Sequence, residues 1–169
     1  VPHSNFFKTG LSNQTIVWKV AAIDTAYKRG PWSTLKTNQP PITASNATTT
    51  TPYYSIQAAI NAAAPGQTIH LANGLHAVSL NLSRKTNLTI VARSWVLSSI
   101  NTNAKIDPPA GDGVVMTNSK GVTIRGLTLK GGSSGIAVQG ASRSILVDAC
   151  RIFSNTAGFV DGVGANRNR

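Results

Sequence analysis

The chain has 169 residues, the length of one ordinary domain or of two small ones. Its hydrophobic content of 41 % excludes a disordered chain, and no apolar run reaches the ~18 residues of a membrane-spanning helix. Sixteen Lys and Arg residues against five Asp and no Glu give a net charge of +11, which disfavours sites built from clustered carboxylates. The single cysteine, Cys150, excludes an internal disulfide framework.

Residues 1–36 contain two short strand patterns. Alternate residues from Ile16 to Ala22 are apolar, which is typical of a half-buried strand, and a turn at 25–30 leads to a second stretch at 31–35. Two strands and one turn cannot bury Trp18 and Trp32 on both sides. The chain also starts at Val1 without a targeting signal, so we interpret it as a fragment of a longer protein, cut at both ends.

A motif in this region carries a resemblance to a known domain. The chain reads Trp18-Lys-Val-Ala-Ala-Ile-Asp24 and then Pro31-Trp-Ser33, preceded by Leu11 and Thr15. Residues 11–36 therefore resemble the last two strands of a fibronectin type III domain, as found in secreted bacterial enzymes. The resemblance implies that residues 1–36 are a partial β-sandwich; another β-sandwich edge hairpin is the alternative.

A polar, Pro-flanked tract at 37–52 has the composition of a linker, and a further domain is predicted over 53–169. This domain begins with a short helix over 55–64. Ser55 is a good N-cap, apolar residues follow at helical spacing from Ile56 to Ala63, and Pro65-Gly66 ends the helix.

After the helix, the period changes to that of strands and a repeat emerges. Alternating runs are predicted to form strands at 68–71, 78–82, 88–91, 114–116, 122–129, 136–138 and 145–152. Residues 113–116 recur at 135–138, a shift of 22, and residues 121–129 recur at 144–152, a shift of 23. Residues 87–90 fit the same frame one coil earlier, across an insertion near 95–112. A period of 22–23 with several short strands indicates a β-solenoid of about four coils.

The entry to these coils carries a second resemblance. Residues 54–76 read Tyr-Ser-Ile-Gln-Ala-Ala-Ile-Asn-Ala-Ala-Ala-Pro-Gly-Gln-Thr-Ile-His-Leu-Ala-Asn-Gly-Leu-His. This stretch resembles the start of the right-handed parallel β-helix of the pectin-lyase-like superfamily, in which the helix caps the open end of the solenoid. The resemblance implies an all-β, right-handed parallel β-helix with a short N-terminal capping helix. It says little about function, because that fold carries lyases, hydrolases, epimerases, adhesins and phage spikes.

Three departures from the family pattern bear on metal binding. Gln67 stands where the family usually has Asp, and His76 where it usually has Tyr. Asp148 falls where pectate lyases carry a Trp-x-Asp-His segment, but its neighbours here are Val147 and Ala149. We therefore expect no cofactor in this fragment, and Ca²⁺ enters only as an option for the parent protein.

The repeat frame sorts side chains into inward and outward positions. Inward positions are Ile124, Leu127, Leu129, Val147, Cys150 and Ile152, and outward positions are Arg125, Thr128, Lys130, Asp148 and Arg151. The 23-residue shift places Asp148 beside Arg125, so we predict a cross-strand ion pair. Arg125, Lys130 and Arg151 are candidate substrate-binding residues for an acidic polysaccharide, since β-elimination needs a cation and a base that is often Arg or Lys. A solvated basic face is the alternative.

The other chemistry-bearing residues predict no metal site or nucleophile. Asp107 and Asp112 flank a loop insertion without further oxygen ligands, and His70 and His76 lack partners at metal-ligand spacing. Cys150 occupies an inward slot and is interpreted as a small buried hydrophobe.

The charge and the two resemblances together set the functional hypothesis. Basic residues are scattered and aromatic residues make up only 6 %, so neither a nucleic-acid site nor a membrane partner is expected. We predict a fragment of an extracellular carbohydrate-active protein, a polysaccharide lyase acting on acidic glycans whose catalytic centre lies beyond this fragment. A non-catalytic glycan-binding or adhesion β-helix is the alternative, and a phage spike is a third option. The catalytic residues and the oligomeric state stay open.

Overall fold

The structure, a computed structural model, describes residues 16–19, 21–23, 26–34, 36–38, 40–93 and 104–162. The chain divides into two compact units, Val1–Pro41 and Ile42–Arg169. Within the described residues, no helix has the length and hydrophobicity needed to cross a membrane.

The described part of the first unit forms two antiparallel strand pairs. Strand β1 (Ile16–Trp18) pairs with β4 (Lys36–Asn38), and β2 (Ala21–Ile23) pairs with β3 (Arg29–Trp32). Two cations lie over the ring of Trp32: Lys19 Nζ is 4.9 Å and the guanidinium carbon of Arg29 is 4.7 Å from the ring centroid. Four of the residues that carry the fibronectin type III resemblance, Leu11, Thr15, Val20 and Asp24, lie outside the described residues. That assignment stays a prediction.

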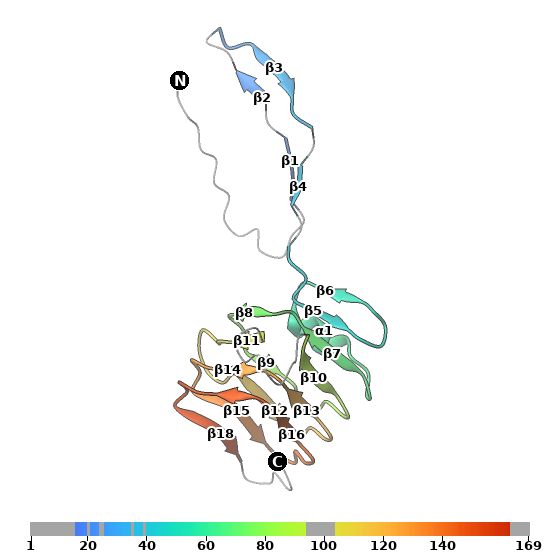
Figure 1. Cartoon of the computed structure of the whole chain (residues 1–169), viewed down its shortest axis with the longest axis vertical. Helices are drawn as coiled ribbons and strands as arrows, with labels where there is room; N and C mark the ends of the chain where they lie inside the picture. The colour runs from blue at the N-terminus through green and yellow to red at the C-terminus, as the bar shows by residue number, and fades with distance from the viewer. Residues whose placement is uncertain are drawn as a thin grey trace. The chain divides into compact units, whose positions relative to one another are not determined.

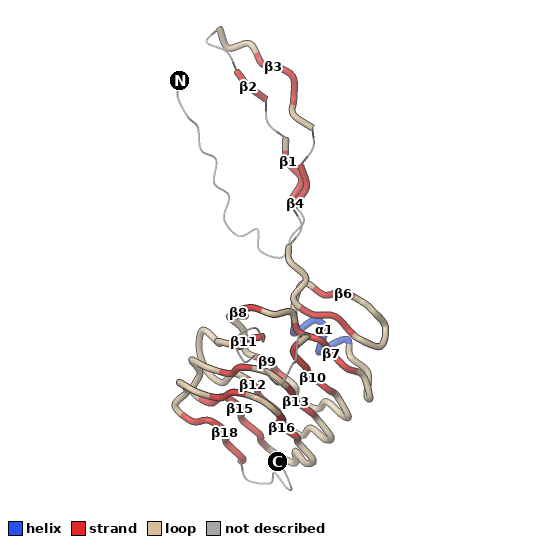
Figure 2. The backbone as a smooth tube through the Cα atoms, viewed as in Figure 1, coloured by secondary structure: helices blue, strands red, loops and turns tan. Residues whose placement is uncertain are grey.

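The second unit is a parallel β-solenoid of four coils (Figures 1 and 2). Each coil contributes one strand to each of three sheets, and every strand pairs in parallel with its equivalents in the neighbouring coils. The first sheet contains β7 (Thr68–Leu71), β10 (Thr89–Ala92), β13 (Thr123–Arg125) and β16 (Leu146–Asp148). The second contains β8 (Gly74–His76), β11 (Ala104–Ile106), β14 (Thr128–Leu129) and β17 (Arg151–Ile152). The third contains β9 (Leu80–Asn81), β12 (Val114–Thr117), β15 (Ser134–Gln139) and β18 (Ala157–Asp161).

The strand register confirms the repeat that the sequence predicts. Val114 pairs with Ile136, a shift of 22, and Ile124 pairs with Val147, a shift of 23. The earlier coil also fits, since Ile90 pairs with Ile124 across the predicted insertion. Because the fold class rests on this stacking, the all-β solenoid is confirmed.

The hydrophobic core runs along the solenoid axis and is formed by the inward-facing side chains of successive coils. Ile124, Leu127 and Leu129 are at most 1 % exposed, as predicted. Their equivalents in the fourth coil, Val147, Cys150 and Ile152, also face the core but are only partly buried. They are less buried because the described chain places no further coil on that side.

One short helix covers the other end of this core. Helix α1 (Ile56–Ala62) begins after Ser55, whose side chain accepts a hydrogen bond from the Ala58 N–H, as the N-cap pattern predicts. Ile56, Ala59 and Ile60 are buried within the core cluster, so α1 caps the first coil.

Part of the predicted linker 37–52 is structured. Strand β5 (Ala44–Asn46) pairs antiparallel with β7, and β6 (Pro52–Tyr53) pairs antiparallel with β5. The sequence pattern did not reveal these strands because they bury few apolar side chains. These strands are stabilised mainly by backbone hydrogen bonds, which pair the N–H and C=O groups at the otherwise open edge of β7.

Candidate basic surface

The outward position of the first sheet holds the predicted ion pair. Arg125 Nε lies 2.8 Å from an Asp148 carboxylate oxygen, and the two residues are register partners in β13 and β16. Both side chains are more than a third exposed, so the pair contributes at most about 1 kcal/mol to stability. The cation at Arg125 is therefore largely compensated before any ligand arrives.

The other two candidate residues lie at or just after strands of the second sheet. Lys130 Nζ lies 2.9 Å from a carboxylate oxygen of Asp107, one coil earlier. The guanidinium of Arg151 stacks on the ring of Phe153, with its central carbon 4.5 Å from the ring centroid. The fold thus places Arg125, Lys130 and Arg151 on the outer surface, but Arg125 and Lys130 are already ion-paired.

One outward position is less exposed than predicted. Thr128 is only 3 % exposed, and its hydroxyl has no hydrogen-bond partner among the described residues. Its register partners on the neighbouring strands are Lys105 and Arg151. A short side chain between two long ones is shielded from water, because long basic side chains lay their methylene stems along the sheet.

A second group of cations lies at the corner that leads into the first sheet. Thr86, Lys120 and Arg143 follow one another in successive coils, and Lys120 forms parallel bridges with both neighbours. Beneath them, Ser119 and Ser142 are buried: the Ser119 hydroxyl donates to the Leu82 carbonyl at 2.6 Å, and its N–H donates to the Ser142 hydroxyl at 3.1 Å. These buried hydrogen bonds fix the corner backbone that carries the cations.

We call Lys120 and Arg143 the basic corner. Both side chains are exposed, and neither forms an ion pair with an acidic residue in the described part of the chain. Like charges in register on adjacent strands repel each other, so an anion that spans both coils is favoured there. The preceding coil differs, because Thr86 stands at this position and the Nζ of the adjacent Lys85 donates to the Asn61 and Ala63 carbonyls at the end of α1.

The basic corner is not among the predicted site residues, although its signal is present in the sequence. Lys120 and Arg143 are separated by 23 residues, the same shift that relates the strands around them and that pairs Arg125 with Asp148.

His76 and Cys150 behave as structural residues. His76 is buried, and its Nε2 lies 2.8 Å from the Ala72 carbonyl oxygen. Burial raises the pKa of the Cys150 thiol, whose sulfur lies 3.4 Å from the Asp148 carbonyl oxygen, so a reactive thiolate is disfavoured. No group of three or more His, Cys or Asp side chains among the described residues could hold a metal ion.

Comparison with known proteins adds no relative: no family model, no curated protein and no solved structure matches this chain.

Proposed function

We propose that the solenoid unit binds acidic polysaccharides through the basic corner. The unit would belong to an extracellular carbohydrate-active protein of the pectin-lyase-like type, joined to a fibronectin type III-like domain. The observation that carries the proposal is the in-register stacking of Lys120 and Arg143 without a described acidic partner.

The geometry of a parallel coil supports a long ligand over a small one. Adjacent coils are spaced by about 4.8 Å, so cations on successive coils form a row along the solenoid axis. A linear polyanion that runs along this axis can meet Lys120 on one coil and Arg143 on the next. The overall charge of +11 adds long-range attraction for the same ligand class.

We also propose that the protein acts by β-elimination on acidic glycans, with a catalytic centre that the described residues do not form. Abstraction of the proton beside a uronate carboxylate needs a base and a cation that neutralises the carboxylate. Arg125 and Lys130 have the required chemistry, but each is held by an aspartate. We therefore expect no ultraviolet-absorbing unsaturated product from pectate, alginate or chondroitin; measurable activity would show that the centre lies within this chain.

Binding is tested by titrating the full chain with polygalacturonate and with neutral dextran of similar length. Wild type should bind the acidic polymer selectively, with an affinity that falls as salt rises. The variant Lys120→Gln/Arg143→Gln should weaken binding about tenfold, which corresponds to ~0.7 kcal/mol for each exposed charge contact.

The matched control is Arg125→Gln/Lys130→Gln, which also lowers the net charge by two. Long-range attraction falls equally in both variants, so a difference between them reports local contacts at the basic corner. We expect only a two- to threefold loss for the control. Equal losses would remove the basic corner as the binding site, and equal affinity for dextran would refute glycan recognition by charge.

A further inference from the structure

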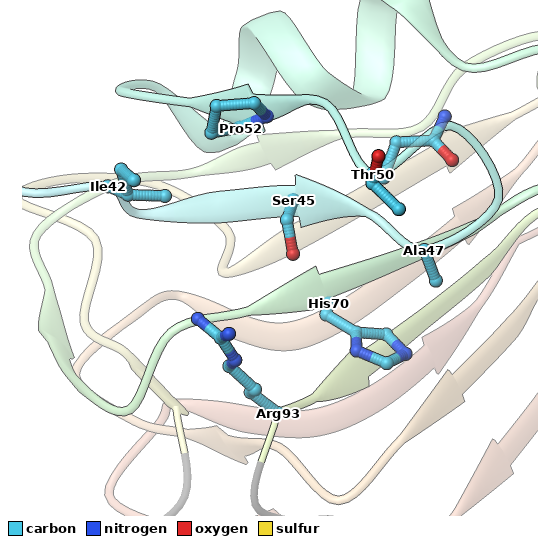
Figure 3. Close-up of a pocket in the computed structure, with 8 residues that line it drawn as sticks. Ile42, Ser45, Ala47, Thr50, Pro52, His70 and Arg93 are labelled. Carbon is cyan, nitrogen blue, oxygen red and sulfur yellow. The ribbon is translucent and has the colours of Figure 1, made fainter.

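A polar hollow of about 360 Å³ lies on the outer surface of the first coil, and neither residue of the basic corner lines it (Figure 3). Its walls come from the segment around β5 and β6, from β7 and from the residue that follows β10. The lining residues are Ile42, Ser45, Asn46, Ala47, Thr50, Pro52, His70 and Arg93.

Strand pairing brings three of its polar side chains to one face. Ser45 and His70 are direct register partners of β5 and β7, so their side chains lie on the same side of the sheet. Arg93 is two residues beyond Val91, the register partner of His70 in β10, and therefore shares that face. The Cα atoms of His70 and Arg93 lie roughly 8 Å apart, because neighbouring strands are spaced by about 4.8 Å and two residues along a strand rise by about 6.6 Å. An arginine side chain spans this distance.

These three groups are not used by the fold. The Ser45 hydroxyl, the His70 ring and the Arg93 guanidinium form no hydrogen bond or ion pair with another residue in the described ranges. By contrast, the neighbouring Asn46 side chain is fully engaged: it donates to Gln67 and accepts from the N–H groups of Thr48 and Thr49. The hollow thus combines a cation and two hydrogen-bonding groups that point at solvent.

Three of the four described carboxylates of the solenoid have other partners, and the fourth, Asp161, lies in β18, in the third sheet and the last coil. Asp107 and Asp148 are paired with Lys130 and Arg125, and Asp112 accepts a hydrogen bond from the Ser134 N–H. The undescribed segment 94–103 contains no acidic residue.

We propose that this hollow binds a single oxyanion group, the carboxylate or sulfate of an acidic sugar. The planar guanidinium of Arg93 matches two oxygens of such a group, and the Ser45 hydroxyl and the His70 ring provide further donors. Ile42 and Pro52 present apolar edges against which a sugar ring can pack. This inference rests on the proposed glycan function for its ligand class, but it concerns a different site.

The experiment titrates the full chain with trigalacturonate, with a sulfated disaccharide and with inorganic sulfate, and measures affinity by calorimetry. Arg93→Gln should weaken binding of the preferred ligand at least tenfold. Its control, Arg84→Gln, removes the same charge from an exposed arginine outside the hollow and should change affinity less than twofold. Ser45→Val, which places methyl groups in the hollow without changing charge, should weaken binding at least threefold.

Histidine side-chain NMR gives a second measurement that does not depend on the variants. Saturating ligand should shift the ring signals of His70 and leave those of His76 in place, because the His76 ring is buried and contacts the Ala72 carbonyl. The ligand that binds most tightly identifies the carboxylate or the sulfate as the natural group. Unchanged His70 signals, or equal losses for Arg93→Gln and Arg84→Gln, would overturn the inference.

The two proposals fail separately. If polygalacturonate binds through Lys120 and Arg143 but Arg93→Gln behaves as Arg84→Gln, the hollow is not a site and the proposed function stands. If trigalacturonate or sulfate binds in an Arg93-dependent way while polymer binding does not depend on the basic corner, the hollow is supported and the proposed surface is refuted.

Discussion

Isoleucine-to-alanine substitutions at two positions in one row of stacked core residues, one inside the solenoid and one in its last described coil, test the stacking of the coils directly. Ile106 and Ile152 occupy equivalent inward positions of the second sheet, each in register with Leu129 between them. Ile106 is fully buried, with His76 on its other side, whereas Ile152 has only one described neighbour in the column and is partly buried. The substitution Ile→Ala removes three carbons at either position, so the two variants differ only in how much of that surface the coils cover.

The structure sets the expected difference. Full burial at about 0.8 kcal/mol per carbon gives a transfer cost of ~2.4 kcal/mol for Ile106→Ala, and the enclosed cavity raises the total to ~3–4 kcal/mol. Ile152→Ala loses only part of the transfer term and leaves no closed cavity, so we expect ~1 kcal/mol. Urea unfolding followed by circular dichroism measures both. Costs equal within ~0.5 kcal/mol, or a larger cost at Ile152, would refute the stacking order.

Three further predictions concern single contacts. Gly135→Ala should destabilise the chain by ~1–3 kcal/mol, because the added Cβ would lie too close to neighbouring atoms, including the Gly158 carbonyl oxygen at 2.7 Å. Thermal unfolding measures this cost. The control is Gly158→Ala, for which the nearest atom to the added Cβ is 3.8 Å away and little change is expected. A double-mutant cycle on Arg125 and Asp148 should give a coupling of at most ~1 kcal/mol that shrinks in high salt; a salt-independent coupling would contradict a half-exposed pair. Burial raises the pKa of the Cys150 thiol, so the alkylation rate of the folded chain should still rise with pH where the alkylation rate of the urea-unfolded chain has levelled off. If the two pH profiles coincide, the thiol is exposed to solvent and the prediction is wrong.

Periodicity in the sequence was sufficient to predict the coils. The shifts of 22 and 23 predict the pairing of Val114 with Ile136 and of Arg125 with Asp148, and both pairs form. Such a fold is readable because each coil contacts only its neighbours, so one local period is repeated along the whole unit. Helix α1 was predictable for a similar local reason: its cap at Ser55 and its apolar face lie within ten residues.

The sequence by itself determined which residues face inward and which coils stack, because both follow from the repeat. Only the tertiary structure decided how the charges are distributed among partners. Lys130 meets Asp107 across a coil whose inserted loop breaks the period, and Lys85 turns to the end of α1, a partner outside the repeat. The pairing of β5 with β7, which assembles Ser45, His70 and Arg93, was equally hidden, since antiparallel edge strands of polar residues leave no hydrophobic pattern. Contacts that depend on three-dimensional closure, and not on the period, therefore place the polar hollow, whereas the basic corner follows the 23-residue repeat.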